Sequence, residues 1–200
     1  MNDIEIIDNF LDSSEFEELK TKMYSQHMLW SYSNILTKDN FIDIICNDLD
    51  NHIMTHLMYD QFCPLSDFFY WMKPIFDSAK MDIKSLVRVK ANLYLRTNER
   101  IVHGYHTDYP FECKTAIFSL NSNDGLTKFE NGQEVESVEN RMVIFNGLLK
   151  IGPVFLNSTS RPKACGITRI SLKRIAASTE RSLMGKRVTF EASSLSFISS

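Results

Sequence analysis

The second half of this chain is a series of short alternating segments separated by turn residues, and this pattern limits the possible folds more than any other feature. Apolar and polar residues alternate over 86–96, as in a strand with one buried face. Further short strands are predicted at 101–107, 115–120, 126–129, 133–138, 142–145, 154–156 and 166–175. Asn131 and Gly132 are a strong signal for a two-residue hairpin turn. The pattern predicts a β-sandwich or β-barrel as the core of the protein.

The first part of the chain instead predicts an α-rich flank. A short strand is expected to start at Ile4, and a helix over 15–23 places Phe16, Leu19 and Met23 on one face. Residues 43–59 suggest irregular structure or short strands. A second helix is predicted over 67–78, with Ser66 as its cap and a kink at Pro74.

The length of 200 residues is enough for one well-buried core. We therefore expect a single domain over 1–178, made of an α-rich flank (1–84) and a β core (85–178). The remaining 179–200 form a serine-rich tail with one candidate edge strand at 187–191.

Charge and composition exclude several classes of protein. The 22 Lys and Arg and 25 Asp and Glu give a net charge of −3, which argues against a nucleic-acid partner. No apolar stretch reaches the ~18 residues of a membrane helix, so no membrane partner is expected. The N-terminus has no apolar signal segment and the 4 cysteines form no CxxC pair. We expect reduced thiols and a cytoplasmic location.

The chemistry is concentrated around His106 and Asp108. Residues i and i+2 of a strand share a face, so these two side chains can converge on one point. An imidazole and a carboxylate are two of the three ligands of a non-haem Fe(II) facial triad, which leaves positions open for O2 and a co-substrate. His103 lies three positions away and faces elsewhere unless the strand bulges. Taken alone, the pair also fits a surface histidine beside a turn aspartate.

The context of this pair resembles a known family. The segments that carry the likeness are 88–94, 106–108, 115–121, 125–129, 138–146 and 168–171. In this order they resemble the Fe(II)- and 2-oxoglutarate-dependent dioxygenases, in particular the small prolyl-4-hydroxylase-like proteins of bacteriophages and marine bacteria. The resemblance implies a double-stranded β-helix, or jelly roll, with an N-terminal strand and helices packed on one sheet. For a viral protein, the location would be the host-cell cytoplasm.

The resemblance also assigns site residues. His106 and Asp108 would bind the iron. Arg169, with Ser171 two residues on, would hold the C5 carboxylate of 2-oxoglutarate, because a planar guanidinium binds a carboxylate through two hydrogen bonds. The strand before the metal strand adds two co-substrate candidates, Asn92 and Tyr94; core packing is the alternative for Tyr94. Ser119 falls where related prolyl hydroxylases often have a tyrosine that contacts the co-substrate.

The third iron ligand of the family is missing. The family has a histidine six positions after a phenylalanine, but here Phe145 is followed at that position by Ile151, and no histidine follows His106. Several explanations stay open. The site has lost its activity, the alignment is offset, the sequence has been deliberately altered, or another residue replaces the ligand. The candidates for such a replacement are His103, Asn146 and Asn157.

The sequence thus predicts an oxidoreductase that uses Fe(II), 2-oxoglutarate and O2 to hydroxylate a substrate, releasing succinate and CO2. The substrate, a protein side chain or a small molecule, is unknown. The alternative is a catalytically inactive jelly-roll module that binds a partner or a dicarboxylate.

Other chemistry-bearing residues have simpler interpretations. Trp30 and Trp71 are expected to pack in the core or flank, and Cys113 to be a buried thiol. His52 and His56 have the spacing of a metal pair on a helix, but no glutamate follows His52 as in a metalloprotease motif.

Overall fold

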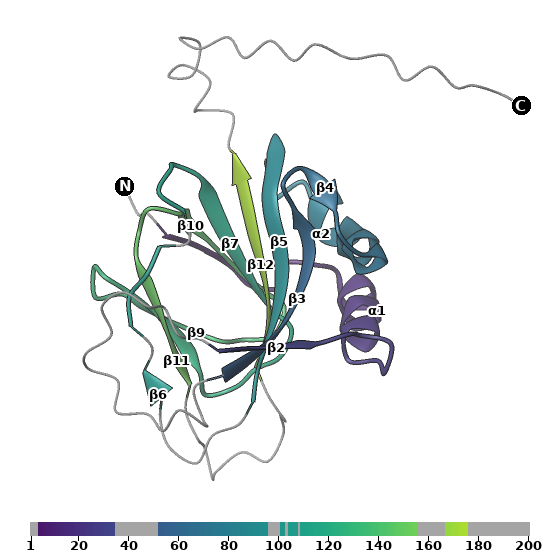
Figure 1. Cartoon of the computed structure of the whole chain (residues 1–200), viewed down its shortest axis with the longest axis horizontal. Helices are drawn as coiled ribbons and strands as arrows, with labels where there is room; N and C mark the ends of the chain where they lie inside the picture. Colours follow the sequence, from purple (N-terminus) through teal and green to yellow (C-terminus); the bar gives the residue numbers. More distant parts are fainter. Residues whose placement is uncertain are drawn as a thin grey trace, which may run out of the picture.

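The strands of this protein lie in two sheets that face each other (Figure 1). The computed structural model describes residues 4–34, 52–95, 101–102, 104–107, 109–155 and 167–175. The predicted tail, with its candidate edge strand at 187–191, lies outside these residues. No helix in the described ranges has the length and apolar character needed to cross a membrane.

The larger sheet, which we call the main sheet, is antiparallel throughout the described residues. In spatial order its strands are β1 (Ile4–Ile7), β10 (Arg141–Asn146), β7 (Lys114–Ser119), β12 (Ile167–Ile175), β5 (Ser85–Tyr94), β3 (His52–Asp60) and β2 (Ser31–Asn34), and β4 (Cys63–Pro64) pairs with the end of β3. The second sheet contains, in order, β6 (Ile101–Val102), β11 (Ile151–Phe155), β8 (Leu126–Phe129) and β9 (Glu134–Glu136).

From β5 onward the chain passes back and forth between the sheets. Strands β5, β7, β10 and β12 belong to the main sheet, and β6, β8, β9 and β11 to the second. This interleaving is the jelly roll, so the predicted fold class is confirmed. Among the described strands none is hydrogen-bonded into both sheets, and the two sheets do not close into a continuous barrel.

The helices cover one face of the main sheet, as Figure 1 shows. They are α1 (Ser13–Met23), the 3₁₀ helix η1 (Asp67–Met72) and α2 (Lys73–Asp77). Helix α1 buries the predicted face of Phe16, Leu19 and Met23. These side chains join a core that includes Val89 of β5 and Leu172 of β12. We call this helix-covered side of the main sheet its outer face.

A second core lies between the sheets. Ile117, Val143 and Phe145 of the main sheet meet Phe129 and Val135 of the second sheet there. We call this side of the main sheet its inner face. Residues on each strand therefore alternate between a helix-covered core and an inter-sheet core.

The flank differs from the prediction in two places. Residues 52–60 form one nine-residue strand, β3, although only irregular structure or short strands are expected there. A bulge between Leu57 and Tyr59 breaks the alternation that would reveal a long strand. The predicted helix over 67–78 is instead η1 followed by α2. Pro74 lies in the first turn of α2, where a missing N–H is tolerated.

The hairpin between β8 and β9 is present, but its loop has three residues rather than the predicted two. The N–H of Phe129 donates to the carbonyl of Gln133 (2.8 Å), which leaves Glu130, Asn131 and Gly132 in the loop. Gly132 has a φ of 85°, a left-handed conformation that suits glycine. Glu130, the extra residue, is fixed at the start of the loop, because its N–H donates to the carbonyl of Lys150 (3.1 Å).

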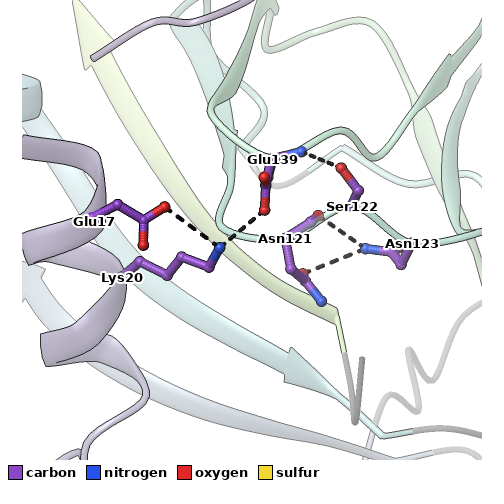
Figure 2. A network of polar contacts seen from close by, with 6 residues as sticks. All are labelled: Glu17, Lys20, Asn121, Ser122, Asn123 and Glu139. Atoms are coloured by element: carbon purple, nitrogen blue, oxygen red, sulfur yellow. Dashed lines mark hydrogen bonds and ion pairs between the residues drawn. The ribbon is translucent and has the colours of Figure 1, made fainter. Parts of the chain in front are cut away.

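The turn before β10 fixes the N-terminal segment onto the sheet. Asn140 is 7% exposed, accepts a hydrogen bond from the N–H of Leu11 (2.9 Å) and donates one to its carbonyl (2.8 Å). Figure 2 shows the neighbouring contacts, in which Lys20 of α1 reaches Glu139 (3.0 Å) and the N–H of Glu139 donates to Ser122. The turn is therefore connected to the segment before α1 by buried hydrogen bonds and to α1 itself by an exposed ion pair.

We expect Asn140→Ala to lower the free energy of unfolding by about 2–4 kcal/mol, because it leaves two buried backbone groups without partners and puts alanine at a left-handed position, with a φ of 57°. Urea denaturation measures this change. Asn131→Ala is the control, since Asn131 makes its turn contact in an exposed loop. Equal losses in the two variants would contradict the role of Asn140.

Candidate functional site

His106 and Ile151 lie directly opposite each other in the structure. The N–H of each donates to the carbonyl of the other, both at 3.0 Å, and the two form an isolated antiparallel bridge. Residues that exchange both hydrogen bonds point their side chains to the same side. Ile151 packs against the inter-sheet core, so this pair lies on the side of the second strand layer that faces the main sheet.

The strands on either side of this bridge have other bounds than the sequence predicts. Strand β6 covers only 101–102 of the predicted 101–107, and pairing resumes at His106. Strand β11 begins at Ile151, three residues before its predicted start. The backbone thus brings position 151 to His106, although the two are 45 positions apart in the sequence.

The metal ligands are only partly within the described residues. His106 is half-buried, and its Nδ1 lies 3.4 Å from the carbonyl of Gly104. Asp108 and His103 lie outside the described residues, as does Asn157, so their assignment stays a prediction. The searched part of the chain holds no group of three or more His, Cys, Asp or Glu placed for a metal ion. Isoleucine has no donor atom. Within the described ranges, the structure therefore places one of the two predicted ligands, His106, opposite a residue that supplies no ligand atom.

Two of the co-substrate candidates, Asn92 and position 169, share one row across the main sheet. Position 169 is the direct partner of Asn92 on β5 and of Ser119 on β7. Its neighbours Ile170 and Leu172 lie in the helix-covered core, so position 169 belongs to the inner face. The backbone thus gathers the predicted arginine position, the predicted asparagine and Ser119 in one line.

Asn92 has an unusual environment for a buried amide. It is 8% exposed, and among the described residues its Oδ1 is fully buried without a hydrogen-bond partner. A buried polar atom without a partner is costly, and native structures keep few of them. Ser119, in the same row, is 4% exposed. The row therefore fits a polar ligand better than it fits an apolar core.

The other two co-substrate candidates lie in adjacent rows. Ser171 is the partner of Lys90 on β5 and of Ile117 on β7. Tyr94 is half-buried, pairs with Ile167 and shares the inner face with Asn92 two residues before it. It makes further contacts within the protein, which agrees with the packing alternative as well as with a ligand contact.

The His52 and His56 pair is not a metal pair on a helix. Both belong to β3, where residues four apart are separated by about 13 Å. His56 is engaged at both ring nitrogens, by the carbonyl of Leu29 (2.7 Å) and the hydroxyl of Ser66 (2.8 Å). Ser66 therefore contacts His56 and makes no side-chain cap to η1. His56 is a structural residue that joins three segments.

The segment leading to Ile151 is held by a close backbone contact between Gly147 and Cys113, which the sequence pattern does not reveal. The N–H of Gly147 donates to the carbonyl of Cys113 (2.7 Å). A Cβ at this glycine would lie 2.7 Å from Sγ of Cys113 and 3.0 Å from Oγ1 of Thr115. Cys113 is a buried, free thiol, as predicted, and Trp30 and Trp71 pack against the helix-covered core, also as predicted. Only the identity of Gly147 hints at this contact.

Comparisons with known proteins identify the fold. No protein-family model and no curated protein matches the chain. A prolyl hydroxylase from Trichoplax adhaerens, solved with a hypoxia-inducible-factor peptide, matches at a TM-score of 0.57 and 17% identity, over 93% of this chain and 89% of that one. A Pseudomonas putida prolyl-4-hydroxylase matches at 0.52 and 12%, over 86% and 92%.

A third solved structure is the epimerase SnoN, in complex with Fe3+, alpha-ketoglutarate and nogalamycin RO. It matches at a TM-score of 0.57 and 13% identity, over 98% of this chain and 91% of that one. At such identities the likeness establishes the fold. The jelly roll of this chain is therefore similar to that of prolyl hydroxylases and other 2-oxoglutarate-dependent enzymes.

We expect Asn92→Leu to leave the free energy of unfolding unchanged or to raise it by up to about 1 kcal/mol, because it removes a buried oxygen that lacks a partner. Urea denaturation measures the change. Thr115→Val is the matched control on the same face, since Thr115 is buried and makes contacts within the protein. It should lower stability by about 1 kcal/mol. A comparable loss in Asn92→Leu would mean that its amide is already satisfied.

Proposed function

We propose that this chain is an Fe(II)- and 2-oxoglutarate-dependent oxygenase of the hydroxylase type, with a metal site reduced to two protein ligands. The observation that carries the proposal is the row formed by Asn92, position 169 and Ser119 on the inner face, with its buried amide oxygen. The jelly roll that this chain shares with prolyl hydroxylases supports it.

The co-substrate half of the site depends on Arg169. Its guanidinium would hold the C5 carboxylate of 2-oxoglutarate through two charge-assisted hydrogen bonds. Ser171, two positions along the same strand, and Asn92, in the neighbouring strand, would supply further hydrogen bonds. A dicarboxylate would thus satisfy the polar groups that this row buries.

The metal half depends on His106 and Asp108. Iron bound there, together with 2-oxoglutarate, would supply the O2-dependent oxidation that hydroxylates the substrate and releases succinate and CO2. His106 presents an imidazole from a backbone position held by two hydrogen bonds. Ile151 lines the opposite position with an apolar side chain and disfavours a substituting water there.

The second candidate is a catalytically inactive module that binds a dicarboxylate or a partner. The pairing of His106 with Ile151 favours it, because the position where the family has its third ligand holds a side chain without a ligand atom. The two candidates share the co-substrate row and differ only in iron binding and turnover.

Replacing Arg169 by alanine should weaken 2-oxoglutarate binding at least about 100-fold, since each charge-assisted hydrogen bond contributes about 1.5–3 kcal/mol. Anaerobic calorimetry measures the affinity. Arg141→Ala is the control, because Arg141 lies in the same row but is bound by Asp8 (2.5 and 3.0 Å), whose pKa this contact lowers. Unchanged affinity in Arg169→Ala would remove Arg169 from the site.

Ile151→His should tighten Fe(II) binding by about tenfold or more, because it restores an anchored donor. It should also raise succinate formation from 2-oxoglutarate and O2. The absorption band of the iron chelate with 2-oxoglutarate, followed anaerobically, reports the metal, and Ile151→Leu serves as the donor-free control. Tight iron binding and full turnover by the parent chain would mean that the third ligand comes from elsewhere. If 2-oxoglutarate binds but neither the parent nor Ile151→His turns it over, the inactive module is the correct candidate.

A further inference from the structure

Two aromatic side chains shortly after His106 pack in series on an arginine of the main sheet. The Arg88 guanidinium carbon lies 5.1 Å from the ring centre of Tyr109. The Tyr109 ring in turn lies 5.0 Å from the ring of Phe111, and the two ring planes are tilted by 35°. A guanidinium, a phenol and a phenyl group thus follow one another as three planar layers. We call Tyr109 and Phe111 the aromatic shelf.

The aromatic shelf lies on the same face of the main sheet as the proposed co-substrate row, but apart from it. Arg88 belongs to the inner face, because its neighbour Val89 is buried in the helix-covered core. Asn92 follows four residues farther along β5, a distance of about 13 Å. Tyr109 comes three residues after His106, so their Cα atoms are at most about 11 Å apart. One substrate molecule can therefore reach both the shelf and the proposed metal ligand and leave the co-substrate row free.

The aromatic shelf is held in position on one side and open on the other. Arg88 is the register partner of Asp60 on β3, and both Arg88 and Tyr109 make further contacts within the protein. Tyr109 is half-buried, whereas Phe111 is 43% exposed. A ring whose support is already ordered binds another group at a low cost in conformational entropy. Phe111 is therefore the layer at which a ligand would be added.

A further aromatic ring is the group that best extends this series of planar layers. Aromatic pairs in tilted or offset arrangements are more favourable than burial of the same apolar area alone, so an aliphatic group gains less at Phe111. A cation is the other group that an aromatic face attracts. Arg88 already has that role at Tyr109, and its positive charge opposes a second cation nearby. The aromatic shelf thus favours a neutral ring.

From this arrangement we infer that the substrate of the site carries an aromatic ring, which packs against Phe111 while another part of the same molecule lies at His106. The inference rests on the proposed function and adds the chemical class of the substrate. The ring belongs either to a side chain of a peptide or to a small molecule, and the aromatic shelf recognises the same chemistry in both.

The test measures binding of four probes to the full chain saturated with 2-oxoglutarate, by ligand-observed NMR titration without O2. The probes are free indole and three glycine pentapeptides whose central residue is tryptophan, leucine or lysine. We expect indole or the tryptophan peptide to bind about two- to tenfold more tightly than the leucine and lysine peptides, because an aromatic pair forms. Tighter binding of the tryptophan peptide indicates a peptide substrate, and tighter binding of indole indicates a small molecule.

The variants assign the binding to the aromatic shelf. Phe111→Leu should weaken binding of the ring probe by about two- to tenfold, because it keeps the apolar side chain and removes the ring. Phe111→Tyr should preserve binding, since the ring remains. Phe62→Leu is the matched control, because it removes another exposed phenyl ring, 74% exposed in the turn between β3 and β4. Thermal unfolding confirms that each variant is folded, and 2-oxoglutarate should bind all of them as it binds the parent chain.

The outcomes separate this inference from the proposed function. If 2-oxoglutarate binds but the ring probes bind no more tightly than the leucine and lysine peptides, the inference alone is overturned. The same holds if Phe111→Leu behaves like Phe62→Leu. If 2-oxoglutarate itself does not bind the parent chain, the proposed function fails and the inference fails with it.

Discussion

The alternation of side chains along the strands of the main sheet determines which residues enter the helix-covered core and which line the candidate site on the inner face. On β5, Val89 and Ala91 point toward the helices, and Lys90 and Asn92 belong to the opposite face. A shift of one residue would bury the polar side chains under the helices and expose the apolar side chains. The core and the candidate site therefore both depend on the register between β5 and β12. Its bulge, between Lys173 and Arg174, lies past the rows that contain Asn92 and Lys90.

The two halves of the candidate site depend on different parts of the chain. The co-substrate half depends on which side chains share a row. The proposed metal half depends on His106, which is held by backbone hydrogen bonds with Ile151 that any residue other than proline could make. An exchange of histidine and isoleucine at position 151 therefore adds or removes a ligand atom without changing the strand pairing. If the proposed function is correct, this separation would let the jelly roll keep one half of its site while the other half varies.

The sequence predicts the fold well where the alternation is regular. It predicts β5, β8 and the buried face of α1 almost to the residue. It fails at β3, where a bulge shifts the alternation, and at the start of β11. Strand β11 begins at Ile151 because Ile151 pairs with Phe129 of β8 on one side and with His106 on the other, and no local pattern contains that information.

The candidate site is predictable to a different degree. Residue types point to His106 and Arg169, and the backbone brings the position of Arg169 beside Asn92 and Ser119. The sequence does not reveal that Asn92 has a buried oxygen without a partner, because burial of a single atom depends on packing from several strands. The contact between Gly147 and Cys113 is unpredictable for the same reason.

The position of β12 has a consequence for how the protein folds. It is the last described strand in the sequence, yet it lies between β5 and β7 in the middle of the main sheet. Until β12 is synthesised, these two neighbours have unpaired edges, which are prone to pair with other chains. The strand that carries Arg169 must also pair with two strands that lie far before it in the sequence, and such non-local pairing slows folding. Arg169, the residue proposed to bind the co-substrate, therefore belongs to the strand that completes the sheet.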